Sequence, residues 1–142
     1  MAVVLKGIYI LAIAIDRDIT VEVGSLGKLC FEKGFYAYVG SAQNNMEKRL
    51  KRHVEKASKT RFWHIDYLLA DGSVNVVGIF FKEAGKSAEC ETAQNLAKHG
   101  LPIEGFGCSD CNCKSHLFMF QDRRMLEDVC LRLGFKPLLP RQ

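Results

Sequence analysis

What this chain can fold into is limited first by an unbroken apolar run near its start, Gly7 to Ile15, with isoleucine at four positions. The run is far shorter than the roughly 20 residues that a membrane-spanning helix needs. Only Lys6 supplies a charge directly before it, and Asp16-Arg17-Asp18 closes it without a signal-peptide cleavage pattern. Isoleucine is favoured in strands, so a strand buried on both faces explains the run best. The sequence therefore predicts a globular, cytoplasmic protein built on a central strand.

The rest of the chain carries strand and helix patterns of ordinary length, which predict one α+β domain over residues 1–142. Alternating apolar residues between turn glycines indicate strands, the first four of them forming an antiparallel meander. Apolar residues at helical spacing, with a capping residue before them, indicate helices. The predicted strands cover residues 8–15, 19–23, 28–32, 35–40, 74–81 and 116–120, and the predicted helices cover 45–58, 87–99 and 122–134.

The positive charge of the chain is concentrated in one window. The net charge is +4, and between Glu47 and Arg61 seven basic residues stand against two acidic ones. The rest of the chain is therefore close to neutral. A positive patch on a neutral body suits a polyanionic partner, although a solvated helix face explains a charge run equally simply.

Two strand tripeptides, Gly7-Ile8-Tyr9 and Tyr38-Val39-Gly40, are followed by Arg49, His53 and a helix that carries Glu89. In this order they resemble the GIY-YIG nuclease superfamily, and most closely a compact, stand-alone branch of archaeal and bacterial proteins. The resemblance covers residues 7 to about 120. Further matching stretches are residues 36–42, 49–53, 63–67, 89–90 and 106–117.

The resemblance implies a small antiparallel sheet flanked by helices, with an extra N-terminal hairpin between the motif strands and a C-terminal strand–helix extension. The motif core would span residues 7–102, a Cys/His loop 103–117 and the last helix 122–134. Family members cut phosphodiester bonds with one divalent cation, Mg²⁺ or Mn²⁺, held by a glutamate. By this resemblance the ligand is Glu89, and the other catalytic residues are Tyr9, Tyr38, Arg49 and His53.

These residue types suit phosphodiester hydrolysis. The Arg49 guanidinium is permanently charged and can donate to two phosphate oxygens at once. His53 follows one helical turn later on the same face, so it can reach the same phosphate and pass a proton. Cations and a metal-bound water nearby favour the deprotonated form of a tyrosine, and this phenolate can accept a proton from that water. Tyr38 is the preferred base and Tyr9 its orienting partner, although the roles can be exchanged.

Each residue also has a structural explanation when it is taken alone. Tyrosines on strands are usually core aromatics, and Glu89 can simply favour the positive end of a helix dipole. The chain departs from the family pattern at Ser41, where repair-type relatives tend to have a basic residue, and at Pro102-Ile103-Glu104-Gly105, where many have Pro-x-Tyr-Asn. Glu91 can compete with Glu89, but Glu89 shares a helical face with apolar residues and is preferred.

A second group of candidate ligands lies in the Cys/His loop. Three thiols and an imidazole can hold zinc in a tetrahedron, although closed structural sites more often join two separated pairs. A redox-labile thiol pair and reduced structural cysteines are the alternatives. Cys30, Cys90 and Cys130 are predicted to be buried small hydrophobic residues. The candidate zinc ligands are Cys108, Cys111, Cys113 and His116.

Trp63-His64-Ile65-Asp66 is the last candidate segment. In an extended segment, His64 and Asp66 would face the same way and could supplement the metal site or contact a phosphate. A core tryptophan with solvated neighbours is the alternative, and Trp63 can also stack on a base. The predicted nucleic-acid contacts are Lys48, Lys51, Arg52, Lys56, Arg61, Trp63 and His64.

The motif order and the basic window together predict a metal-dependent endonuclease that acts on DNA in repair or a related process. A protein partner in that process is a further expectation, and no membrane partner is expected. The runner-up is a nucleic-acid-binding module that keeps the scaffold without cutting. In a third hypothesis the Cys/His loop is the functional part, and the protein is a zinc-stabilised interaction domain.

Overall fold

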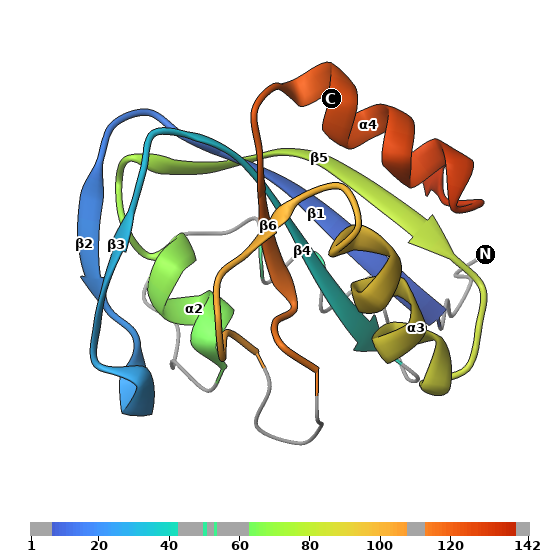
Figure 1. The fold of residues 1–142 in the computed structure, drawn as a ribbon, viewed down its shortest axis with the longest axis horizontal. Helices are drawn as coiled ribbons and strands as arrows, with labels where there is room; N and C mark the ends of the chain where they lie inside the picture. The colour runs from blue at the N-terminus through green and yellow to red at the C-terminus, as the bar shows by residue number, and fades with distance from the viewer. Residues whose placement is uncertain (1–6, 43–49, 51–52, 54–62, 108–112, 139–142) are drawn as a thin grey trace, which may run out of the picture.

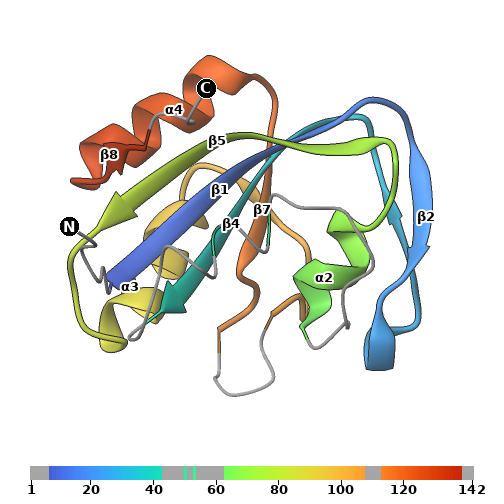
Figure 2. The same cartoon turned by 180° about the vertical axis from the view of Figure 1, so that it is seen from behind.

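The central strand predicted from the apolar run is β1 (Gly7–Ile15), and it is buried along almost its whole length. In the computed structural model, which describes residues 7–42, 50, 53, 63–107 and 113–138, β1 pairs antiparallel with β4 (Gly34–Ala42) on one side and β5 (Val74–Lys82) on the other. Figure 2 shows β1 between these two strands. Both edges of β1 are therefore paired, which makes it a central strand of the sheet.

Three short strands extend the sheet to six. The order of the six strands is β6–β7–β4–β1–β5–β8, and every neighbouring pair is antiparallel. The short strands are β6 (Leu101–Pro102), β7 (Leu117–Phe120) and β8 (Lys136–Pro137). A small antiparallel sheet with flanking helices was predicted, and this α+β architecture is confirmed.

The chain between β1 and β4 forms a separate hairpin. β2 (Ile19–Glu22) pairs with β3 (Lys28–Phe31), and a 3-10 turn, η1 (Gly24–Leu26), connects them. Because β1 pairs with β4 instead of β2, the four strands are not the simple meander that their spacing predicted. The extra hairpin between the motif strands is confirmed.

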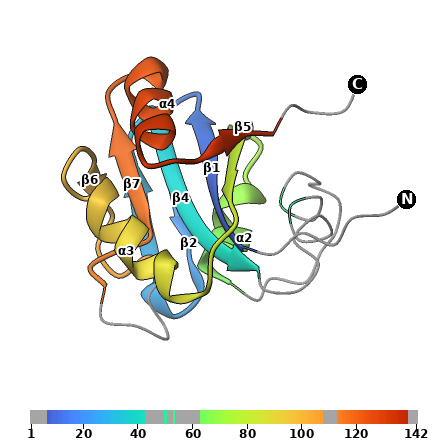
Figure 3. The ribbon, with the colours of Figure 1, turned by 90° about the vertical axis from the view of Figure 1, so that its right-hand side faces the viewer.

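Helices cover both faces of the sheet. α2 (His64–Leu69) packs on one face together with the β2–β3 hairpin, while α3 (Ser87–Leu96) and α4 (Arg123–Arg132) pack on the other. Figure 1 shows the hairpin beside α2, and Figure 3 shows α2 and α3 on opposite sides of the strands. The alternation of side chains along β1 and β4 therefore sorts their residues into two cores.

The C-terminal helix begins and ends as predicted. The Asp122 carboxylate accepts a hydrogen bond from the Met125 backbone N–H at 2.7 Å, which caps α4. Gly134 has a φ of 91°, a conformation that glycine adopts without strain. The strand–helix extension of β7 and α4 is thus present.

Within the described part of the chain, no helix has the length and apolar character that a membrane crossing requires. Most of the predicted helix over residues 45–58 lies outside the described residues. Leu50 and His53 are described, and both are helical and buried.

Candidate functional site

Two tyrosines and a histidine meet at the end of the sheet where β1 begins and β4 ends. Tyr9 and Tyr38 project from neighbouring strands onto the face that α2 covers, with ring centroids 6.5 Å apart. The Tyr9 hydroxyl lies 2.8 Å from His53 Nε2, across 44 residues of sequence. The Tyr38 ring lies 6.4 Å from the imidazole, and all three side chains are at most 7% exposed. We call Tyr9, Tyr38 and His53 the tyrosine cluster.

Gly40 makes room for this cluster. It stands opposite Tyr9 in the β1–β4 register, and a Cβ added there would lie 2.5 Å from the Tyr9 hydroxyl and Cζ. Any larger residue would displace the ring. The glycine of the second tripeptide therefore lets a phenol lie directly over the backbone of the neighbouring strand.

A third tyrosine on the same face, Tyr36, serves the structure. Its hydroxyl donates to the Glu32 carbonyl oxygen at 2.7 Å. Burial, with nearby carboxylates adding to it, raises the pKa of Tyr36 to about 12. A phenol with such a pKa stays protonated, so Tyr36 is unsuited to act as a base.

The Trp63–Asp66 segment begins α2 and is not extended. The Trp63 backbone N–H donates to Asp66 Oδ2 at 3.0 Å, and Asp66 is fully buried. The expectation that His64 and Asp66 would face the same way required an extended segment. On the helix, residues two apart point in nearly opposite directions, so the two side chains do not face the same way. The Trp63 ring is 39% exposed and lies 6.4 Å from His53, so it can still offer a stacking surface beside the cluster.

His64 also has a structural role. Its Nδ1 accepts a hydrogen bond from the Gly107 backbone N–H at 2.8 Å. Burial lowers the pKa of His64 below its usual 6.5, so the neutral ring that this bond requires is favoured. One nitrogen is thus committed to the fold, although His64 was predicted to contact nucleic acid.

The segment at Phe106 and Gly107 lies between the tyrosine cluster and a second group of polar side chains. The Phe106 ring is 6.2 Å from Tyr38 and 5.7 Å from His64. At Gly107, where φ is 76°, an added Cβ would lie 3.1 Å from the His116 Cβ and 3.5 Å from Tyr38 Cε1. Tyr38 and His116 are therefore separated by little more than one glycine.

Glu89 belongs to this second group. Its Oε2 lies 3.1 Å from His116 Nδ1, and its side chain is 17% exposed. As the sequence predicted, Ala93 and Leu96 on the same helical face are buried and Glu91 is exposed. The helix that carries Glu89, however, packs on the face opposite the tyrosines. The structure thus joins Glu89 to His116 at the same end of the sheet, and not directly to the tyrosine cluster.

Two cysteines complete the second group. Cys90, Cys113 and His116 each offer a ligand atom, and these atoms all lie within 4.8 Å of one another. We call these three residues the thiol–imidazole cluster, and its geometry can hold a metal ion. The sequence predicted Cys113 and His116 but not Cys90, which was expected to be a buried hydrophobic residue and is only partly buried.

The remaining cysteine expectations had different outcomes. Cys130 is buried, as predicted, and burial raises the pKa of its thiol to about 12. Cys30 is exposed on β3, so its predicted burial was wrong. On β3, Cys30 shares a face with exposed Lys28, while Leu29 and Phe31 point to the other side, so the thiol lies on the outer side of the hairpin.

Several predicted site residues lie outside the described part of the chain. Among them are Arg49 and the basic residues that were expected to contact nucleic acid. They are Lys48, Arg49, Lys51, Arg52, Lys56, Arg61, Cys108 and Cys111.

Comparison with known proteins gives one family. No curated protein and no solved structure matches the chain. The model of one family, described as a domain of unknown function, DUF123, matches residues 8–136. The match spans both clusters and every described strand except Gly7 at the start of β1 and Pro137 at the end of β8. This protein therefore belongs to the DUF123 family.

Proposed function

We propose that this protein is a divalent-metal-dependent endonuclease that hydrolyses phosphodiester bonds in nucleic acid, with DNA as the expected substrate. The observation that carries the proposal is the buried hydrogen bond between Tyr9 and His53, with Tyr38 beside it. Burying an imidazole and phenols in an apolar core is costly, which favours a role for them beyond packing. The same three residues are those that the resemblance to the GIY-YIG superfamily singles out.

The topology supports the same proposal. The strand carrying Gly7-Ile8-Tyr9 lies at the centre of the sheet, and the strand carrying Tyr38-Val39-Gly40 pairs with it so that Tyr9 faces Gly40. Placing DUF123 within that superfamily is part of our proposal. The extra β2–β3 hairpin accounts for the long separation between the two tripeptides.

Glu89 is the residue that would hold Mg²⁺ or Mn²⁺. Its carboxylate is partly exposed at the start of α3, and these cations prefer carboxylate and water oxygens. A bound ion would polarise the phosphoryl oxygen and stabilise the leaving oxygen. Figure 1 shows the first turn of α3 beside the end of β4. A phosphate at this end of the sheet could therefore approach both the Glu89 carboxylate and the tyrosine cluster.

The chain's own side chains would supply the proton transfer and the orientation. Tyr38, in its deprotonated phenolate form, would accept the proton of the attacking water at its phenolic oxygen. Tyr9 would orient that water or the phosphate, because its hydroxyl is held in place by His53. Arg49 would pair with the phosphate oxygens through its forked guanidinium.

The test is cleavage of duplex, nicked and branched DNA with Mn²⁺ or Mg²⁺. We expect cleavage that EDTA abolishes and that Tyr38→Phe lowers by about 100-fold or more, as loss of a general base does. Glu89→Ala should have a similar effect. The matched controls are Tyr36→Phe, which removes a structural phenol from the same strand, and Glu91→Ala, an exposed carboxylate two residues from Glu89. Unchanged cleavage by Glu89→Ala would refute this proposal.

A non-cutting nucleic-acid-binding module is the second candidate. The position of Glu89 favours it, because the carboxylate contacts His116 and its helix packs on the face opposite the tyrosines. This function predicts binding without metal-dependent turnover. Arg49→Ala and Lys51→Ala should each lower the slope of log affinity against log salt by about 0.9. The control is Lys28→Ala, on the β2–β3 hairpin.

A further inference from the structure

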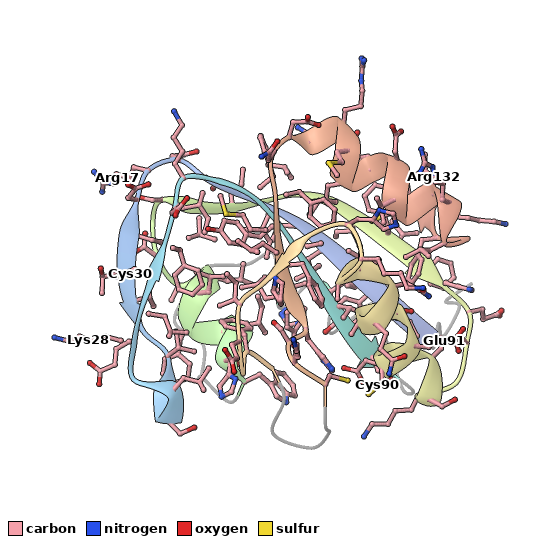
Figure 4. The ribbon with its side chains drawn as sticks, in the orientation of Figure 1. Arg17, Lys28, Cys30, Cys90, Glu91 and Arg132 are labelled. Atoms are coloured by element: carbon pink, nitrogen blue, oxygen red, sulfur yellow. The ribbon has the colours of Figure 1, made fainter. Side chains whose placement is uncertain are left out.

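The thiol–imidazole cluster joins two parts of the chain that are distant in sequence. Cys90 lies in the first turns of α3, whereas Cys113 and His116 precede β7. Figure 4 shows Cys90 on α3, on the opposite side of the molecule from Cys30 on β3. All three ligand atoms lie within 4.8 Å of one another without a disulfide between the cysteines.

We propose that Cys90, Cys113 and His116 bind one zinc ion that fastens α3 to the start of β7. Zinc holds sulfur at about 2.3 Å and imidazole nitrogen at about 2.0 Å in a tetrahedron, which places neighbouring ligand atoms roughly 3.5–4 Å apart. The three ligand atoms, all within 4.8 Å of one another, lie near enough to reach this arrangement. Thiolate and imidazole select zinc over magnesium, whose preferred ligands are oxygens.

Glu89 gives the cluster the surroundings that a zinc-bound histidine usually has. A histidine that ligates zinc through one nitrogen commonly donates its other N–H to a carboxylate, which fixes the ring and raises its basicity. The Glu89 Oε2 atom lies 3.1 Å from His116 Nδ1, close enough to take this role once the imidazole is oriented by the metal. Zinc would then bind at Nε2, and Glu89 would act as a positioning residue for this site.

The backbone around His116 is already fixed, so the site is partly organised. The His116 N–H donates to the Phe106 carbonyl at 2.8 Å, and its carbonyl accepts from the Val39 N–H at 2.9 Å. His116 is 3% exposed. The ion would complete a connection from α3 through His116 to β4, the strand that carries Tyr38. The three zinc ligands take no part in the proposed nuclease chemistry, although Glu89 belongs to both proposals.

The proposal differs from the ligand set that the sequence suggested, because it requires Cys90. The test measures the zinc content of purified protein by inductively coupled plasma mass spectrometry, and zinc affinity by competition with a chromogenic chelator. We expect about one zinc per wild-type chain and its loss in Cys90→Ser. Glu89→Gln should retain zinc with affinity lowered by about 10- to 100-fold. The matched control is Cys30→Ser, an exposed cysteine on β3, which should retain the ion.

A wild-type protein that takes up no zinc would overturn the proposal, as would a Cys90→Ser variant with unchanged affinity. A Cys90–Cys113 disulfide in protein purified without reductant would also overturn it. Cobalt substitution in the wild-type protein provides a measurement that needs no variant. A thiolate-to-cobalt charge-transfer band is expected, and a spectrum without it would count against the site. These readouts are independent of DNA cleavage.

Discussion

The Tyr9 ring and the Gly40 backbone are in direct contact, which makes Gly40 a sensitive position for testing the tyrosine cluster. A Cβ there would lie 2.5 Å from the Tyr9 hydroxyl and would force the ring away from His53. We expect Gly40→Ala to lower the free energy of unfolding by about 1–3 kcal/mol, as overpacking of a core does, and to abolish cleavage.

The matched control is Gly78→Ala on β5. Its Cβ would meet the Ala12 Cβ at 3.4 Å, an ordinary contact. Urea denaturation and a cleavage assay on both variants provide the comparison. Equal stability and activity in the two variants would mean that the Tyr9 position is not constrained in the way that we describe.

His64 predicts a dependence of stability on pH. Burial lowers its folded-state pKa below 6.5, so the unfolded chain binds a proton more readily than the folded one. The resulting loss of folding stability is absent well above pH 6.5 and grows as the pH falls below that value. We expect the free energy of unfolding, measured with urea, to decrease between about pH 7 and about pH 5.

The control for this prediction is His64→Gln, whose side-chain oxygen can accept from the Gly107 N–H but does not titrate. Its stability should fall less over the same pH range than that of the wild type. Parallel pH profiles for the two proteins would contradict the assigned role of His64.

At the residue scale, the sequence identified the tyrosine cluster because ordered motifs carry information over long separations. Tyr9, Tyr38 and His53 meet as the resemblance implied. Cys90 could not be identified in the same way, since its partners lie more than 20 residues later and no local spacing links them. The prediction that Cys30 is buried was wrong, because the outer face of the two-stranded hairpin is exposed to solvent.

Among the elements, the predicted strands agree best with the structure where the pattern was strongest. β1, β4 and β5 are long and apolar, and all were predicted within two residues of their bounds. α2 was not predicted, because six residues starting at His64 are too few to show a helical period. The pairing of β1 with β4 depends on contacts across the hairpin, which alternation within single strands does not encode.

The N-terminus of α4 supports a prediction that separates stability from function. Asp122→Ala removes the bond to the Met125 N–H and should lower the free energy of unfolding by about 0.5–2 kcal/mol. Cleavage should be unchanged at a temperature where the variant is folded, because α4 packs on the face opposite the tyrosines. Asp128→Ala, an exposed carboxylate on the same helix, should change stability by less than about 0.5 kcal/mol. A loss of activity in folded Asp122→Ala would link α4 to the site.

Across the whole molecule, two polar clusters occupy one end of a sheet that is otherwise apolar on both faces. The tyrosine cluster lies on the α2 face, and Glu89 with the thiol–imidazole cluster lies on the α3 face. Figure 3 shows these two helices on opposite sides of the strands. The short segment at Phe106 and Gly107 is their common neighbour. The proposed nuclease therefore requires a phosphate to bridge the end of the sheet.

Crystals of the protein with bound duplex DNA and Mn²⁺ would test this requirement directly through the anomalous scattering of manganese. We predict a manganese peak at the Glu89 carboxylate, with a phosphate between the ion and the Tyr38 hydroxyl. Manganese absent from Glu89, with the phosphate backbone bound away from Tyr38, would contradict the account and leave nucleic-acid binding as the function.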